Sequence, residues 1–483
     1  MLRTLLTVTF AGLSLALLAP CSRSQKPGSN VVFLMADDLG YGDLGSYGQS
    51  KIKTPQLDRL AAEGMRFTQH YAGSTVCAPS RCVLLTGRHS GQAWVRGNYE
   101  MGGWEQGNRE GQLALPEGSF TLGRLFKNAG YATCAIGKWG LGGPHSTGHP
   151  NRQGFDHWFG YLCQRHAHNY YPTHLWRNET RVELEGNAWK KLRGKHYAPD
   201  LMIREALQWI RANKDRPFFL YYPTPVPHLA LQVPEQAVAE YHGMWEDPPY
   251  DGKRGYLPHP SPRAAYAAMI SRMDHDIGRI LNLLDELKLS DNTIVFFTSD
   301  NGATFNLGGA DSSFFDSCGG LRGRKCSLYE GGIRVPMIVR WPGKIAAGTQ
   351  SSVISMFTDF LPSFAEILGE DTPDDLPGLS LVPTWTGQGR QQQHPWLYWE
   401  YHAGGGSQAV RLGQWKALRQ RIRQQEDAPI ELYDLSQDRG ESKDIAKKHP
   451  DLVERIRMIM DLREPSPIPR WNLRKQRSRK ADL

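Results

Sequence analysis

Residues 77–88, CAPSRCVLLTGR, contain the side chains of this chain that are best suited to covalent chemistry. Cys77 stands two positions before a proline, Ser80 and Arg81 follow, and an apolar stretch then leads to a Thr-Gly pair. A thiol is a nucleophile when its surroundings activate it. A free cysteine more often packs in a core as a small apolar group. Cys77 is therefore either reactive or structural, and the rest of the sequence must decide which.

Oxygen-bearing side chains follow two apolar runs that are typical of buried parallel strands, residues 31–35 and 292–299. These side chains are Asp37 and Asp38 after the first run, and Asp300 and Asn301 after the second. Open α/β sheets place their ligands at the carboxyl ends of strands, so the two pairs are expected at one site. A single aspartate is more often a helix cap or a turn residue. Because such pairs follow both strands, a functional role is favoured over a structural one.

Residues 77–88 resemble the signature of the sulfatase family, the formylglycine-dependent, arylsulfatase-like enzymes of the alkaline phosphatase superfamily. The resemblance implies that a maturation enzyme oxidises Cys77 to formylglycine. The hydrated aldehyde would attack the sulfur of a sulfate ester, release the alcohol, and then expel sulfate as the aldehyde forms again. Arg81 would place a positive charge beside this nucleophile.

The resemblance extends over about residues 31–446 and also implies a bound cation. The positions that match the family's metal site are Asp37, Asp38, Cys77, Asp300 and Asn301. Oxygen ligands without a histidine favour calcium over zinc. Such a cation would neutralise charge on the sulfate oxygens as the S–O bond breaks.

Three further residues match positively charged or acid–base positions of the family. Lys138, in GKWGLG, and Lys325, in LRGRKCSLYEGG, match the sulfate-binding lysines and would form a cationic clamp with Arg81. His228 matches the histidine that protonates the leaving alcohol, a role that suits the near-neutral pKa of imidazole.

One position departs from the family pattern. Many members read GKWHLG and use that histidine to contact the formylglycine, whereas this chain has Gly140. Either His145, His166 or His168 supplies the contact from another loop, or the proton of the hydrated aldehyde is removed in another way.

Residues 160–176 are too polar and too aromatic for a core element, and we predict that they line a sugar-binding pocket with help from the C-terminal region. Interleaved aromatic residues are equally compatible with ordinary loop packing. The predicted substrate contacts are Gln164, His166, His168, Asn169, Glu400 and His402. The resemblance to bacterial glycan sulfatases implies a sulfated saccharide, with 4-sulfated galactose or N-acetylgalactosamine as one candidate.

The elements that must position these residues alternate between strands and helices, with helical spacing at residues 57–65, 121–129 and 264–287. We expect an α/β fold, in which helices flank a large mixed, mostly parallel sheet of the alkaline-phosphatase-like type. Short strands at residues 396–401, 408–412 and 415–419, and a helix at 452–462, predict a smaller antiparallel sheet with a helix.

These patterns divide the 483 residues into four parts. The predicted parts are a signal peptide at residues 1–29, a catalytic domain at 30–385, a small α+β subdomain at 386–465 and a basic, solvated tail at 466–483.

The N-terminal segment predicts export, because Arg3 precedes an apolar run at residues 5–18 that is too short to span a bilayer comfortably. Cys21 follows Leu-Ala-Pro and is a candidate for lipidation, although a proline just before the cysteine is atypical. Plain cleavage and secretion is the alternative. The protein is thus expected in the periplasm, anchored to the outer membrane, or outside the cell.

Composition adds two exclusions. Seven cysteines without regular spacing predict neither a disulfide framework nor a zinc site. Much of the net charge of +8 lies in the last fourteen residues, and no nucleic-acid-binding motif accompanies it. A modestly basic body suits an anionic substrate better than a nucleic-acid partner.

Two alternative functions stay open from sequence. A phosphodiesterase or phosphonate monoester hydrolase would share the superfamily fold. A sugar-binding lipoprotein with an unmodified Cys77 would keep the fold and lack the chemistry.

Overall fold

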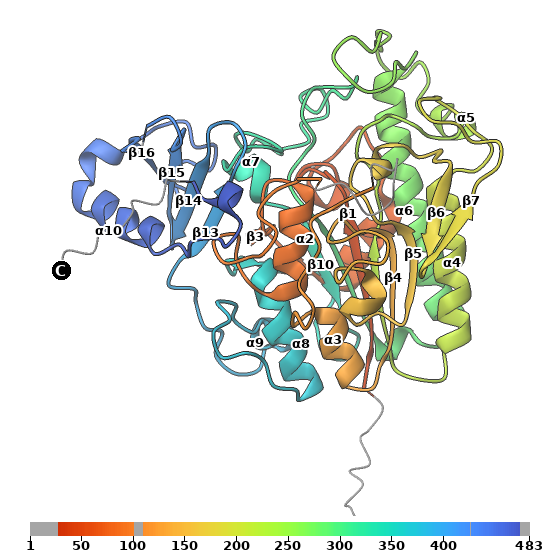
Figure 1. Cartoon of the computed structure of the whole chain (residues 1–483), viewed down its shortest axis with the longest axis horizontal. Coiled ribbons are helices and arrows are strands. Elements are labelled where there is room, and N and C mark those ends of the chain that lie inside the picture. Colours follow the sequence, from red (N-terminus) through yellow and green to blue (C-terminus); the bar gives the residue numbers. More distant parts are fainter. Residues whose placement is uncertain (1–27, 101–109, 426, 474–483) are drawn as a thin grey trace, which may run out of the picture.

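The computed structural model describes residues 28–100, 110–425 and 427–473, and a ten-stranded mixed sheet forms its centre (Figure 1). The sheet order is β11-β2-β10-β9-β1-β8-β4-β5-β6-β7. The bounds of these strands are β1 Asn30–Ala36, β2 Met65–Phe67, β4 Ala132–Lys138, β5 His157–Tyr161, β6 His174–Arg177, β7 Thr180–Glu183, β8 Phe218–Pro223, β9 Thr293–Ser299, β10 Met337–Arg340 and β11 Thr349–Ser351. A separate two-stranded sheet pairs β3 (His70–Tyr71) with β12 (Ser355–Met356).

The central strands β9, β1, β8, β4 and β5 are mutually parallel, whereas β10 on one side and β6 on the other run antiparallel to them. The edge strand β7 is antiparallel to β6 and so has the direction of the central strands again. Every residue of β1 is buried, as expected for a strand covered on both faces. The register pairs Ala36 of β1 with Ser299 of β9. The residues that follow these two strands therefore leave the sheet side by side, as the sequence predicted.

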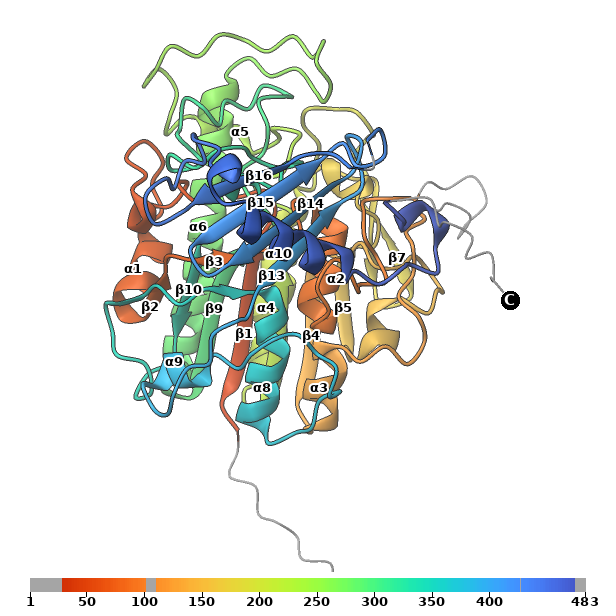
Figure 2. The same ribbon diagram turned by 90° about the vertical axis from the view of Figure 1, so that its left-hand side faces the viewer.

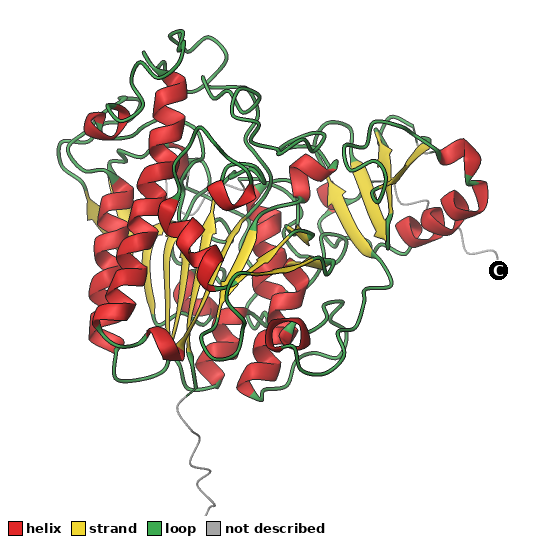
Figure 3. Ribbon diagram, turned by 180° about the vertical axis from the view of Figure 1, so that it is seen from behind, coloured by secondary structure: helices red, strands yellow, loops and turns green. Residues whose placement is uncertain are grey.

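Helices cover both faces of the large sheet (Figures 1 and 3). One face packs against α1, α4 and α6, and the other against α2, α3, α8 and α9. The helix bounds are α1 Pro55–Glu63, α2 Cys77–Thr86, α3 Leu122–Asn128, α4 Ala198–Asn213, α5 Glu235–Val238, α6 Pro262–Glu286, α7 Glu330–Ile333, α8 Phe360–Leu368 and α9 Val382–Thr386. The predicted α/β class is confirmed, and the three predicted helices correspond to α1, α3 and α6 with slightly displaced ends.

A four-stranded antiparallel sheet follows, built from β13 (Leu397–Tyr401), β14 (Ser407–Leu412), β15 (Trp415–Gln420) and β16 (Ile430–Asp434). The last helix, α10 (Pro450–Asp461), lies across its outer face (Figure 2). The inner face packs on the large domain through a cluster that includes Trp399 and Tyr71. The predicted small sheet and helix are confirmed, and β16 adds a strand that the sequence analysis did not identify.

The C-terminal segment differs from its prediction. Residues 466–473 were expected to begin a solvated tail, but Trp471 is 4% exposed and Leu473 is 2% exposed. The apolar surface of these two side chains explains the difference, because burying it outweighs the solvation of the basic residues around them. Residues 474–483 lie outside the described part of the chain, as do residues 1–27 with the predicted signal peptide and Cys21. Within the described ranges, no helix combines the length and apolar character needed to span a bilayer.

Candidate active site

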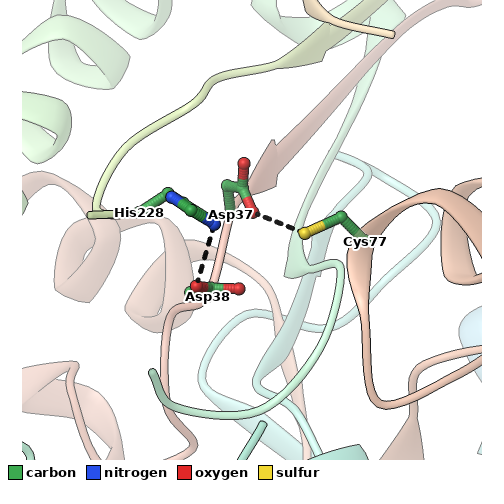
Figure 4. A group of neighbouring side chains, drawn as sticks. All are labelled: Asp37, Asp38, Cys77 and His228. Atoms are coloured by element: carbon green, nitrogen blue, oxygen red, sulfur yellow. Dashed lines mark hydrogen bonds and ion pairs between the residues drawn. The ribbon is translucent and has the colours of Figure 1, made fainter. Parts of the chain in front are cut away.

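The residues predicted to act on the substrate converge at the carboxyl ends of three parallel strands, of which β9 and β1 are neighbours and β4 is separated from β1 by β8. Asp37 and Asp38 follow β1, Asp300 and Asn301 follow β9, and Lys138 is the last residue of β4. Cys77 is the first residue of α2, and its side chain points toward Asp37, as Figure 4 shows. The sheet topology thus assembles one site from segments that lie far apart in the sequence.

The oxygen-bearing side chains form a connected, fully buried group. The backbone N–H of Asp38 donates to Asp300 Oδ1 at 3.1 Å, and Asn301 Nδ2 donates to Asp38 Oδ1 at 2.8 Å. Arg81 donates to Asp300 Oδ2 from two of its nitrogens, at 2.8 and 3.0 Å. Asp38 has a φ of 67°, in the left-handed region that is uncommon for non-glycine residues, although aspartate adopts it more often than most.

Two observations show that these residues suit a divalent cation. Asn301 Oδ1 is buried and has no hydrogen-bond partner among the described residues. Burial and the nearby charge of Asp37 raise the pKa of Asp300 to about 7, which shows how unfavourable the crowding of carboxylates is. A cation bound to the oxygens of Asp37, Asp38, Asp300 and Asn301 would satisfy the amide oxygen and relieve the crowding. An all-oxygen side-chain set fits calcium.

Two buried lysines flank position 77. Lys138 Nζ lies 2.5 Å from Asp37 Oδ2 and 3.6 Å from Cys77 Sγ. Lys325 Nζ lies 2.8 Å from Asp38 Oδ2 and 3.5 Å from the same sulfur. Burial and the charge of Asp37 raise the pKa of the Cys77 thiol to about 12, even with the two lysines beside it. The encoded thiol is therefore protonated at neutral pH and is a poor nucleophile in this environment.

His228 lies on the other side of the same group (Figure 4). Its Nε2 is 3.0 Å from Lys325 Nζ and 3.6 Å from Asp38 Oδ2, while Nδ1 contacts the carbonyl of Leu229. This arrangement directs Nε2 toward the reaction site. Burial and the charges of Lys325 and Lys138 hold the pKa of His228 well below its usual range. An anionic substrate between these cations would shift that balance toward the protonated imidazole.

A cavity of about 540 Å³ opens over the site, between the large domain and the small sheet. Of the predicted substrate contacts, His168 and His402 line it. The ring of His168 stacks on His228 with centroids 4.1 Å apart. His402 Nε2 lies 2.9 Å from Glu400 Oε2, and that buried carboxylate also receives two hydrogen bonds from Arg463. Glu400 therefore lies behind His402 and not on the cavity wall.

Two other predicted contacts lie in internal networks. His166 and His174 stack with centroids 4.3 Å apart and share the carboxylate of Glu110. The possible ligand atoms of these three residues lie within 4.8 Å of one another, but near-parallel rings around a shared carboxylate are typical of a hydrogen-bonded network. The Asn169 side chain bonds to the backbone of Tyr171 and to Gln232. Neither His166 nor Asn169 is among the residues lining the cavity.

Gln164, also predicted to bind substrate, occupies the space beside Gly140. A Cβ at position 140 would lie 1.5 Å from Gln164 Nε2, so the glutamine amide fills the volume that a side chain there would need. The Gln164 side chain is buried, and its Oε1 has no partner within the described ranges. A buried glutamine thus fills the space beside position 140. Of the three candidate histidines, His168 stacks on His228, and the contact of a histidine with position 77 stays a prediction.

Several cavity residues were not predicted. They include Tyr99, Tyr256, Phe305, Arg423, Arg470 and Trp471. The only sequence signal for the last two was an aromatic residue inside an otherwise basic C-terminal segment.

Comparison with known protein families identifies the family in which this arrangement of residues occurs. Residues 29–370 match the family model described as Sulfatase. The chain belongs to the sulfatase family. Residues 323–463 of this sulfatase also match the model for the C-terminal region of N-sulphoglucosamine sulphohydrolase. The expected family is confirmed, and the protein is a sulfuric ester hydrolase.

Relatives of this sulfatase span most of its length. An N-acetylgalactosamine-6-O-sulfatase of Bacteroides thetaiotaomicron is 31% identical, over 91% of this chain and 93% of the relative. The N-acetylgalactosamine-6-sulfatase of dog, Canis lupus familiaris, is 33% identical, over 86% and 75% of the two chains. The structure of Ps i-CgsB in complex with k-i-k-neocarrahexaose is 28% identical, with a TM-score of 0.74 and coverage of 90% and 92%. The expected alkaline-phosphatase-like fold is confirmed.

Proposed function

We propose that this sulfatase hydrolyses a sulfate ester on a saccharide, using a formylglycine formed from Cys77 and a bound calcium ion. The arrangement around one atom carries the proposal: Cys77 Sγ lies 3.4 to 3.6 Å from Asp37, Lys138 and Lys325. A protonated thiol makes only a weak hydrogen bond to Asp37 in that arrangement, whereas an oxygen nucleophile that accepts an SO₃ group would use all three neighbours.

The residues of the chain have distinct tasks in this reaction. Lys138 and Lys325 hold the sulfate beside position 77, and Arg81 fixes the orientation of Asp300. His228 donates a proton from Nε2 to the departing alcohol, whose alkoxide would otherwise be a poor leaving group. The calcium ion, held by Asp37, Asp38, Asp300 and Asn301, would supply positive charge opposite the sulfate oxygens.

The names of the relatives support a saccharide substrate. Two of them are called N-acetylgalactosamine-6-sulfatases. We therefore favour a 6-sulfated amino sugar over the 4-sulfated unit that the sequence analysis considered. The proposal also includes export by the segment at residues 1–29, with Cys21 either acylated or removed, and maturation by a formylglycine-generating enzyme.

The test combines modification and turnover in one preparation. Protein from the native host, or from a host with the maturation enzyme, should contain a residue-77 peptide without sulfur by mass spectrometry. It should release sulfate from 6-sulfated N-acetylgalactosamine faster than phosphate from the matching phosphate ester. Chelation should abolish turnover and calcium should restore it, while Cys77→Ala should fold and stay inactive.

Two results would contradict this function. Faster turnover of the phosphate ester would favour the phosphodiesterase or phosphonate hydrolase alternative. An unmodified Cys77 in protein from the native host, together with saccharide binding and no turnover, would favour the sugar-binding alternative.

A further inference from the structure

Two arginines line the cavity in addition to the residues beside position 77. Lys325 and His228 line it beside position 77, whereas Arg470 lines it beside Tyr99 and Arg423 is bonded to Arg470. The lining residues within the described ranges include no aspartate and no glutamate. A cavity with permanent cations and no carboxylate on its described walls suits a ligand with more than one negative charge.

The C-terminal segment that supplies Arg470 is held firmly in place. Arg463 Nη2 donates to the carbonyl of Trp471 at 3.0 Å, and Arg423 Nη2 donates to the carbonyl of Arg470 at 2.8 Å. The side chain of Asn472 bonds to the backbone of Ser466 in both directions, at 2.9 and 3.0 Å. The two arginines are therefore linked to each other through the backbone, although they come from different loops.

An aromatic ring stacks on one of these arginines. The guanidinium carbon of Arg470 lies 3.2 Å from the ring centre of Tyr99. Stacking of this kind leaves the N–H edge of a guanidinium free for bidentate contact with a carboxylate or a sulfate. Trp471 contacts Tyr99 edge to face, with centroids 6.3 Å apart, and lies 5.4 Å from His402. Both rings line the cavity beside Arg470, and Tyr99, which is 44% exposed, gives a saccharide an accessible apolar surface.

We propose that Arg423 and Arg470 form a second anion-binding subsite, which recognises a carboxylate or sulfate on a sugar next to the one that is desulfated. This inference rests on the proposed function, because the first sulfate defines which end of the cavity is catalytic. The substrate class is then an acidic oligosaccharide with at least two anionic groups, one at Lys325 and His228 and one at the arginines. Release of a neutral alcohol at the first end leaves the second contact intact.

Kinetics of Arg470→Gln and Arg423→Gln on four substrates test the subsite. The substrates are a 6-sulfated N-acetylgalactosamine monosaccharide, and disaccharides in which the neighbouring sugar is neutral, a uronate, or sulfated. Each variant should raise KM about tenfold for the acidic disaccharides, the loss expected for one charge-assisted hydrogen bond. Turnover number should change little, and the monosaccharide and neutral disaccharide should be processed as by the wild type.

Arg457→Gln is the matched control, because Arg457 is exposed on α10 and does not line the cavity. A KM effect with only the uronate or only the sulfated neighbour would identify the anion. Equal effects on all four substrates, or none on any, would overturn the subsite. If the wild type turns over no sulfate ester, the proposed function fails. The subsite is then tested by calorimetric binding of the uronate disaccharide to Cys77→Ala, with and without Arg470→Gln.

Discussion

At the residue scale, Gly140 and Gln164 form a pair in which each constrains the other. Gly140 has a φ of 82°, which disfavours any residue with a Cβ, and the glutamine amide fills the space beside it. A histidine at position 140 therefore cannot be restored by a single substitution. The glutamine brings a buried amide to the place where many family members have an imidazole.

Gly140→Ala should destabilise the protein more than its backbone conformation alone requires. The matched control is Gly130→Ala, since Gly130 has a φ of 81° and nothing within 4 Å of its would-be Cβ. The excess loss at position 140 should be about 1 to 3 kcal/mol in urea unfolding, as for other overpacked sites. Adding Gln164→Ala should remove that excess. Equal losses at both glycines would show that the glutamine does not restrict position 140.

At the element scale, Asp359 ties the start of α8 to the segment that leads to the small sheet. Its carboxylate accepts from the backbone of Met356 at 2.9 Å and of Leu379 at 3.0 Å, and lies 2.9 Å from His394 Nε2. Burial alone would lower the pKa of His394, but the charge of Asp359 outweighs it and raises that pKa above 6.5. Protonated His394 is thus stabilised in the folded state.

This contact makes part of the stability depend on pH. Because the pKa of His394 is higher in the folded protein, its stabilising contribution is complete below the unfolded value of 6.5 and disappears as the pH rises through the folded value. His394→Gln should cost about 1.5 kcal/mol at pH 5.5 and much less at pH 9. Urea unfolding at the two pH values measures the difference. A constant cost would mean that His394 contributes without its charge.

At the scale of the whole molecule, a buried ionic network joins the small sheet to the large domain. Lys416 of β15 lies 3.0 Å from Glu330 at the start of α7 and 3.3 Å from Glu441, and all three side chains are fully buried. Burial raises the pKa of Glu441 to about 7, whereas Lys416, Arg334 and Arg411 together outweigh burial at Glu330 and lower its pKa to about 2. The network fixes the orientation of the sheet that carries His402.

Lys416→Met should leave these two carboxylates without their shared partner. The expected loss is about 3 to 5 kcal/mol of unfolding free energy, together with a higher KM because one cavity wall comes from the small sheet. Lys443→Met is the control, since Lys443 is exposed in the same region. If the variant is destabilised but its KM is unchanged, the network contributes to stability and does not shape the cavity.

Sequence by itself determined which residues meet at the candidate active site, because motifs that directly follow a strand are placed by the end of that strand. Once β1 and β9 are parallel neighbours, Asp37 and Asp300 must meet, and a helix that begins at Cys77 directs that side chain to the same edge. The small sheet was predictable from its alternating apolar pattern, except for β16. Acidic residues interrupt the apolar pattern of β16, so its sequence does not indicate a strand. Its pairing with β15 in the structure does.

Only the tertiary structure decided which polar residues face the substrate. His166, Asn169 and Glu400 have the right chemistry, but they contact internal partners and are not among the residues that line the cavity. Trp471 brings Arg470 to the cavity because its indole is buried against elements far away in the sequence. Local patterns specify which strand a residue follows. The direction of a loop side chain depends on long-range packing, which no short stretch of sequence contains.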